Sequence, residues 1–171
     1  MSLIDSAIQF DYFSFDWCQQ RRSRKLLVPI SRSISHTADG YLYVVFGLLM
    51  LYLGYQTFFT IAFVAFTTER AIYFFLKNRV RRNRPPDVIP GFKSIIQASD
   101  KFSFPSGHTS AAFLMSTLCT LYFPLAGIFL YPWACSVAWS RVMLGVHFPT
   151  DTVAGAVLGG SIAIFVCAQL A

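Results

Sequence analysis

The chain of 171 residues has little charge, and acidic side chains are especially few. Charged residues make up 13% of the sequence, and only 8 are Asp or Glu. A soluble domain of this length has too small an interior to bury a composition that is 55% hydrophobic. The scarcity of charge therefore argues against a soluble globular protein and favours several helices that cross a membrane.

Cysteine is also scarce, and its four positions form no recognisable pattern. Cys119, Cys135 and Cys167 lie within apolar runs, and Cys18 stands alone near the beginning. There is no Cys-x-x-Cys pair, and no carboxylate cluster or His/Cys group has the spacing of a metal site. We therefore expect no disulfide framework, no metal ion and no cofactor.

The sequence has no internal repeat, no low-complexity segment and no recognisable cleavable signal peptide. Asp5 stands where a signal peptide carries basic residues, and no long apolar core follows it. The net charge of +6 is more informative. In so apolar a chain we assign this charge to a membrane face and its lipid phosphates, and not to nucleic acid binding. The length favours one domain, residues 1–171.

Residues 1–40 precede the first long apolar run and differ from it in composition. They are rich in aromatic residues and carry a basic cluster at 21–25. This pattern favours a segment that lies in the membrane interface, and a mobile tail is the alternative. Thr37 or Asp39 is expected to cap the helix that follows, while a second interpretation places His36 at the lip of a substrate site.

Residues 41–171 predict an all-α, multi-pass transmembrane helical bundle with about five spans. The apolar runs cover about 41–55, 57–76, 109–123, 125–139 and 152–170. Short turns join the first run to the second and the third to the fourth, so each pair is expected to form a hairpin. Gly155 and Gly159 have the spacing of a close helix contact, which favours packing within the chain over dimerisation.

Two ionisable residues, Glu69 and Arg70, fall inside the second run, where a charge is costly unless it faces protein or water. Arg70 lies seven residues before Lys77, so both are expected on one face of the helix. Two interpretations stay open. The two residues could pair with a neighbouring helix, or they could support Lys77.

Three polar stretches interrupt the apolar sequence where the hairpins should bring them to one side of the membrane. The first runs from Lys77 to Arg84 and Pro85, the second is Pro105-Ser106-Gly107-His108, and the third runs from Arg141 through His147 to Asp151. Ser106 is a favourable N-cap, and a helix that begins there would point the backbone N–H groups of Ser106 and Gly107 at an anion.

These stretches resemble the three-part signature of the type 2 phosphatidic acid phosphatase superfamily. Every defining position matches at the required spacing across residues 77–151. The resemblance and the residue types imply one set of roles. His147 is the nucleophile that forms a phosphohistidine, Asp151 orients it, His108 protonates the leaving oxygen, and Lys77, Arg84, Ser106, Gly107 and Arg141 bind the phosphate.

We therefore expect a metal-independent enzyme that hydrolyses a phosphomonoester or diphosphate of a lipid. The substrate class stays open among phosphatidic acid, phosphatidylglycerophosphate, undecaprenyl diphosphate and lipid A, and the sequence does not indicate the oligomeric state. A lipid phosphotransferase with the same nucleophile is one alternative, and a non-catalytic membrane scaffold or transporter is another. Vanadium haloperoxidases share the signature, but they are soluble and lack this hydropathy.

Two arguments disagree about the membrane face that carries the site. Apart from Arg70, every Lys and Arg falls on the side of the three motifs, which by the positive-inside rule predicts a cytoplasmic site. Similar bacterial lipid phosphatases mostly act at the outer face of the cytoplasmic membrane. On that resemblance we expect a bacterial inner-membrane protein with a periplasmic site. Arg79, Arg81 and Arg82 are expected to contact lipid headgroups.

Overall fold

The computed structural model describes residues 3–98 and 100–170. These residues form helices and connecting loops without a strand, which confirms the predicted all-α class. The elements are α1 (Leu3–Gln19), α2 (Arg24–His36), α3 (Gly40–Tyr52), α4 (Gln56–Val80), α5 (Pro85–Val88), α6 (Gly107–Tyr122), the 3₁₀ helix η1 (Pro124–Ala126), α7 (Gly127–Met143) and α8 (Pro149–Leu170).

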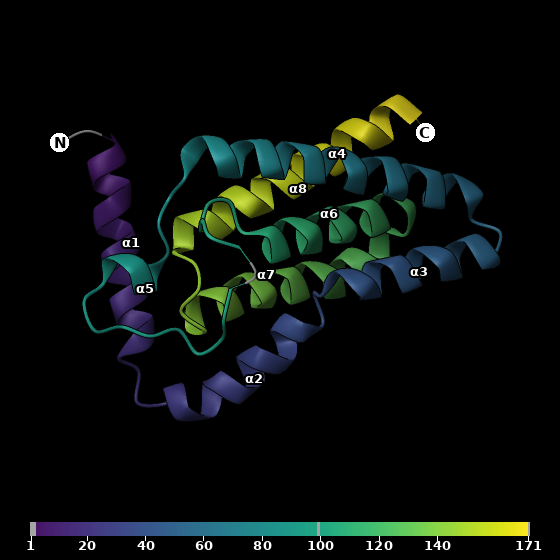
Figure 1. The fold of residues 1–171 in the computed structure, drawn as a ribbon. Coiled ribbons are helices and arrows are strands. Elements are labelled where there is room, and N and C mark those ends of the chain that lie inside the picture. Colours follow the sequence, from purple (N-terminus) through teal and green to yellow (C-terminus); the bar gives the residue numbers. More distant parts are fainter. Residues whose placement is uncertain (1–2, 99, 171) are drawn as a thin grey trace.

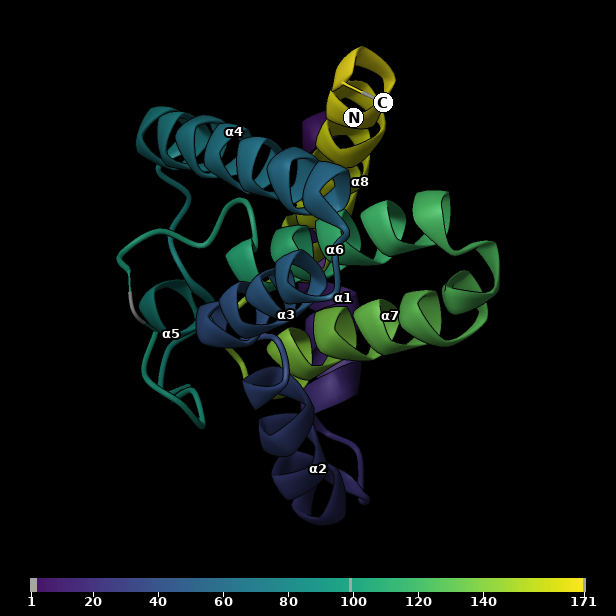
Figure 2. The ribbon, with the colours of Figure 1, turned by 90° about the vertical axis from the view of Figure 1, so that its right-hand side faces the viewer.

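The longer helices run side by side as a bundle, and α6 lies in its middle. Figure 1 shows α1 crossing one end of this bundle, while the α3–α4 turn lies at the opposite end. Figure 2, which looks along the bundle, shows α6 surrounded by its neighbours. Ala112, Leu114 and Leu118 of α6 are completely buried in the core. The last turn of α4, the first turn of α6 and the last turn of α7 lie together at the end of the bundle where α1 crosses (Figure 1).

Two glycines allow α8 to pack directly on the backbone of α6. A Cβ atom on Gly159 would overlap the carbonyl oxygen of Ser110, and one on Gly155 would lie 2.5 Å from the carbonyl oxygen of Ser106. The small-residue spacing thus serves packing within the chain, as expected. This contact fixes the beginning of α8 beside the beginning of α6.

The outer surface of the bundle is apolar, as a membrane protein requires. Tyr52 is 87% exposed, and Leu125 and Phe129 are each 77% exposed. Among the described residues, two helical segments are long and apolar enough to cross a membrane, namely Gln56–Val88 and Pro149–Leu170. The bent pair α2 and α3 would make a third. Helices α6 and α7 have only 16 and 17 residues, so the predicted number of five spans is not confirmed.

The first 40 residues are folded onto the bundle where the structure describes them. Phe15 and Cys18 of α1 are buried in a cluster with Val142, Met143 and Phe148. Helix α2 lies along α7 and bends by 43° into α3. The alternative of a mobile tail is therefore wrong, because α1 buries apolar side chains against the loop that carries the third motif.

Candidate active site

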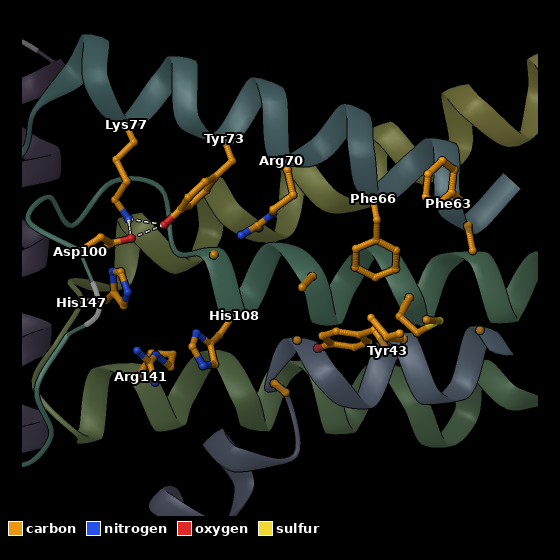
Figure 3. A pocket seen from close by; sticks show the side chains of 18 of the residues that line it. Tyr43, Phe63, Phe66, Arg70, Tyr73, Lys77, Asp100, His108, Arg141 and His147 are labelled. Carbon is orange, nitrogen blue, oxygen red and sulfur yellow. Dashed lines mark hydrogen bonds and ion pairs between the residues drawn. The ribbon is translucent and has the colours of Figure 1, made fainter. Parts of the chain in front are cut away.

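A cavity of about 600 Å³ opens among α3, α4 and α6, and residues from all three motifs line one end of it. Figure 3 shows this end on the left, with basic and imidazole side chains directed inward, and aromatic side chains on the right. The motif residues in the lining are Lys77, Arg84, Gly107, His108, Arg141 and His147. The apolar end includes Tyr43, Phe63, Phe66 and Met115. One cavity thus joins a cationic pocket to an apolar groove.

Helix ends and tight turns place the motif residues at the cavity. Lys77 lies in the last turn of α4, and Arg84 is the N-cap of α5, whose first residue is Pro85. After α7, Gly145 reverses the chain with φ +78. A Cβ atom there would lie 2.6 Å from the Phe92 ring, so the turn requires glycine. This reversal brings His147 back to the cavity.

His147 has its predicted neighbour Asp151 behind it, but the two do not form a hydrogen bond. Nδ1 of His147 lies 3.8 Å from Oδ2 of Asp151, and this oxygen instead accepts the Phe148 N–H at 2.8 Å. Nδ1 is buried without a partner among the described residues. Because Nδ1 faces Asp151, Nε2 is the ring nitrogen that is available to contact a substrate in the cavity.

The electrostatic surroundings keep His147 uncharged. Burial lowers the pKa of His147 to about 3; Arg141 and Arg84 act in the same direction, and Asp151 opposes them. The imidazole is therefore neutral near pH 7 and retains the lone pair that a nucleophile needs.

Arg82 corrects one prediction, because it contacts protein and not lipid headgroups. Its Nη1 donates to Oδ1 of Asp151 and to Oγ1 of Thr150, both at 2.7 Å. Its Nη2 donates to Asp11 of α1 at 2.5 Å. Arg82 therefore holds the far side of the Asp151 carboxylate. Residue type could not reveal this role, because three neighbouring arginines surround it in the sequence.

Asp11 attaches α1 to this arrangement. Its side chain is 1% exposed and accepts the Thr150 N–H at 2.9 Å as well as the Thr150 hydroxyl. Thr150 lies in the first turn of α8, one residue before Asp151. The sequence had no signal for this contact, because 139 residues separate the two partners.

Asp100 is the carboxylate that sequence reasoning missed in the cavity. It accepts hydrogen bonds from Lys77 Nζ and from the Tyr73 hydroxyl, each at 2.6 Å, and it also pairs with Arg84 Nη2. Burial opposes its ionisation, but the hydrogen bonds and the charges of Lys77 and Arg84 outweigh burial and lower the pKa of Asp100 to about 2. The cations expected to bind phosphate therefore hold a carboxylate of the chain itself.

Arg141 is the third predicted phosphate ligand, and it keeps a free donor. Its side chain is buried and donates from Nη1 to Oγ of Ser35 at 2.6 Å. Its Nε is buried without a hydrogen-bond partner among the described residues. Buried charged donors normally have partners, so this nitrogen marks a position where an anion can bind.

His108 pairs with a residue that sequence analysis assigned only to helix capping. Its Nε2 lies 3.2 Å from Oδ1 of Asp39, and Oδ2 of Asp39 lies 3.1 Å from Nδ1 of His36. Asp39 does occupy the N-cap position of α3, but its side chain makes no capping bond. Thr37 donates back to Ile34 instead. The side chain of His36 is 69% exposed and lies outside the cavity lining, so Asp39 separates it from His108.

Ser106 requires a correction too. It is the N-cap of α6 as predicted, but its N–H donates to the carbonyl of Asp151 at 2.9 Å. Its hydroxyl pairs with Thr109 at 3.0 Å, and the residue is completely buried. Ser106 thus joins α6 to α8 and has no free N–H for phosphate. Gly107 does line the cavity, where a Cβ atom would lie 3.1 Å from the Tyr73 ring.

Glu69 and Arg70 pair with each other, so the expected ion pair with a neighbouring helix is wrong. Arg70 donates to Glu69 from Nε at 2.5 Å and from Nη2 at 2.7 Å. The Lys77 ammonium donates to Asp100 and to the Tyr73 hydroxyl. Arg70 lies over the same Tyr73 ring, so support of Lys77 by Arg70 stays a prediction. Arg70 and Lys77 do share one face of α4, as predicted, and both line the cavity.

Comparisons with known proteins agree with this arrangement. The model of the PAP2 superfamily matches residues 57–171. Decaprenylphosphoryl-5-phosphoribose phosphatase of Mycobacterium tuberculosis is 37% identical over 109 residues, which cover 61% of this chain and 55% of that protein. Lipid A 4'-phosphatase of Bacteroides thetaiotaomicron is 33% identical over 89 residues, 50% of this chain and 40% of that protein. The chain thus spans about half the length of these curated relatives.

Solved structures share the fold over nearly the whole chain. The transmembrane PAP2 type phosphatidylglycerolphosphate phosphatase from Bacillus subtilis has a TM-score of 0.79 at 25% identity, with 99% of this chain and 87% of that chain covered. LpxE of Aquifex aeolicus has a TM-score of 0.78 at 22% identity, with 92% of this chain and 94% of that chain covered. At 22% identity, the similarity to LpxE shows a shared fold only.

Proposed function

Because the chain belongs to the PAP2 superfamily, we propose that it is a lipid phosphatase that acts on a phosphomonoester or diphosphate at the membrane surface. The observation that carries the proposal is the cavity itself. Three basic residues and two histidines line one end, and the apolar groove between α3 and α4 forms the other. A phosphate fits the first end, and the hydrocarbon of a lipid fits the second.

In the first step, Nε2 of His147 attacks phosphorus in line with the leaving oxygen. The N–P bond forms as the P–O bond breaks, and its electron pair goes to the leaving oxygen, which takes a proton from His108. Lys77, Arg84 and Arg141 neutralise the charge on the other phosphate oxygens. Asp151 stabilises the positive charge that develops on His147.

In the second step, water attacks the phosphohistidine from the side that the leaving group has vacated. Unprotonated His108 takes a proton from this water, the N–P bond breaks, and inorganic phosphate leaves. Burial and the charge of Arg141 lower the pKa of His108 to about 4, and Asp39, which contacts Nε2 of His108, opposes this shift. The charges on the phosphate are balanced by side chains, so we propose that the reaction needs no metal ion.

The relatives' substrates indicate the range to test, because they include decaprenylphosphoryl-5-phosphoribose, lipid A and phosphatidylglycerolphosphate. We propose a lipid substrate of this kind, in a bacterial inner membrane, with the site on the periplasmic face.

The test is phosphate release by purified protein in detergent micelles. The panel contains phosphatidic acid, phosphatidylglycerophosphate, farnesyl diphosphate and lipid A, with His147→Ala as the inactive reference. The proposal expects free phosphate from at least one lipid with the native chain alone. Transfer of labelled phosphate to a second lipid without free phosphate would identify a phosphotransferase, and no turnover of any lipid would refute the proposed function.

A further inference from the structure

Between its cationic and apolar ends, the cavity has a third zone that the proposed reaction does not use. Arg70 of α4 and Tyr43 of α3 both line this zone. Figure 3 shows the Arg70 side chain directed toward Tyr73 and the Tyr43 hydroxyl directed toward the end that holds His108. Two polar groups from facing helices therefore line the cavity between its phosphate end and its lipid groove.

Arg70 is held so that part of its guanidinium group faces the cavity. Glu69 accepts from Nε and Nη2, which fixes the group from one side, and Nη1 has no hydrogen-bond partner among the described residues. The side chain of Glu69 is 0% exposed and that of Arg70 is 41% exposed. Because Glu69 is absent from the cavity lining, the ion pair presents its positive partner to a ligand.

Tyr43 supplies an independent indication of a ligand. The residue is 9% exposed, and its buried hydroxyl has no hydrogen-bond partner among the described residues. Its ring packs against Phe66 with the centroids 5.2 Å apart, so the hydroxyl is held in place. A buried hydroxyl of this kind normally has a partner, and here it faces the cavity, where it can donate to an anion.

The location of Arg70 and Tyr43 beside the phosphate pocket defines which part of a substrate they would contact. Arg70 Cζ and Lys77 Nζ each lie 4.4 Å from the centroid of the Tyr73 ring, so Arg70 adjoins the phosphate pocket. In the proposed reaction the leaving oxygen faces His108, and the remainder of the leaving group extends from there toward the apolar end. Arg70 and Tyr43 therefore border the first atoms of the leaving group.

We propose that Arg70 and Tyr43 form a second anion-binding position, which recognises a phosphate or phosphodiester carried by the leaving group. The inference rests on the proposed function and narrows its substrate class. Two lipids of the test panel carry such a group close to the leaving oxygen. In a polyprenyl diphosphate the second phosphate is bonded directly to the leaving oxygen, and in a glycerophosphate such as phosphatidylglycerophosphate a phosphodiester follows after three carbons. Phosphatidic acid lacks it, because its leaving group is the neutral diacylglycerol.

The experiment compares kcat/KM for farnesyl diphosphate, phosphatidylglycerophosphate and phosphatidic acid in the same micelles. Arg70→Gln should lower kcat/KM about tenfold or more for the lipid class whose second anion it binds, because a hydrogen bond to a charged group contributes that much. The loss on phosphatidic acid should be at least about fivefold smaller. Tyr43→Phe should likewise lower kcat/KM more for that lipid class than for phosphatidic acid. A loss on farnesyl diphosphate would mean that the second position binds an anion bonded directly to the leaving oxygen. A loss on phosphatidylglycerophosphate would mean that it binds an anion three carbons away.

Two further variants make the result decisive. Arg70→Gln leaves Glu69 buried without its cation, which by itself can damage the fold, so Glu69→Gln/Arg70→Gln is measured beside it. Arg79→Gln makes the same change at an exposed position of the same helix and should alter none of the three activities. Equal losses on all three lipids, or no loss on any, would overturn the second anion position. Failure of the native protein to release phosphate from any lipid would instead refute the proposed function.

Discussion

The carboxylate of Asp100 lies 2.6 Å from the ammonium of Lys77 and also pairs with the guanidinium of Arg84. These are two of the three cations that we propose for phosphate binding. A carboxylate and a phosphate oxygen make the same hydrogen bonds to these donors. A phosphate that binds these donors as proposed has to displace the carboxylate of Asp100, on the loop before the second motif, so we expect Asp100 to compete with the substrate.

The first prediction is that Asp100→Asn binds anions more tightly. The amide keeps the shape of the side chain and loses its charge, so the inhibition constant for vanadate should fall roughly fivefold. Competitive inhibition of phosphate release measures it, and Asp16→Asn, at an exposed position of α1, serves as the control. Weaker vanadate binding would mean that Asp100 holds the two cations in place and does not compete.

The second prediction concerns the two histidines. His147→Ala should lower kcat by at least about 100-fold, because no other group replaces a nucleophile. His108→Ala should cost as much with a lipid phosphate, but much less with an aryl phosphate whose leaving oxygen hardly needs a proton. Turnover of the two substrate types by the purified variants provides the measurement. Equal losses of His108→Ala on both would count against its role as the acid.

A third prediction is that α1 supports catalysis from a distance. Asp11→Ala removes the acceptor shared by Arg82 and Thr150, so Arg82 can no longer fix the Asp151 carboxylate behind His147. We expect kcat to fall about tenfold, because a small displacement of a catalytic group is costly. Asp16→Ala on the same helix is the control. If Asp11→Ala keeps full activity with normal folding by circular dichroism, α1 has no such role.

These contacts show which parts of the protein the sequence could predict. Apolar runs located α3, α4, α6, α7 and α8 but not α1, α2 or α5. Fixed spacings picked out residues that line the cavity, namely Lys77, Arg84, His108, Arg141 and His147, because such signals are local. The pairing of Asp11 with Thr150 joins residues 139 apart, and no local pattern encodes it. Long-range pairing likewise decided the contact of Asp39 with His108 and those of Asp100 with Lys77 and Arg84.

The same limit explains the misassigned residues. Ser106 has the right type and place for an N-cap, but the neighbouring α8 supplies a carbonyl that takes its N–H. Asp39 also stands at an N-cap, and His108 draws its side chain away. In both cases tertiary contacts outweighed a local preference.

The fourth prediction tests the close contact between α6 and α8. Gly159→Ala should destabilise the protein, because its Cβ would overlap the backbone of Ser110. We expect the melting temperature to fall by roughly 5 °C or more. The adjacent Gly160→Ala is the matched control, since its Cβ would meet only the Thr117 hydroxyl at 3.7 Å. Thermal unfolding in detergent followed by circular dichroism should separate the two, and equal melting temperatures would contradict the packing.

The last prediction is that the site faces the periplasm. The positive-inside rule points the other way, but Lys77, Arg84 and Arg141 line the cavity and Arg82 pairs with Asp11 and Asp151. Four basic residues on this side are thus engaged in the protein and are weak evidence for topology. The positive-inside rule is therefore weaker evidence for a cytoplasmic site than the full count of basic residues suggests.

Cysteine labelling of intact cells decides between the two faces. Lys93→Cys places a thiol at an exposed position of the loop between α5 and α6, and Gln56→Cys places one at the opposite end of the bundle, both in a background without the four native cysteines. A membrane-impermeant reagent should label the first in intact cells and the second only after the inner membrane is opened. The reverse pattern would put the site in the cytoplasm and would restrict the enzyme to lipids of the inner leaflet.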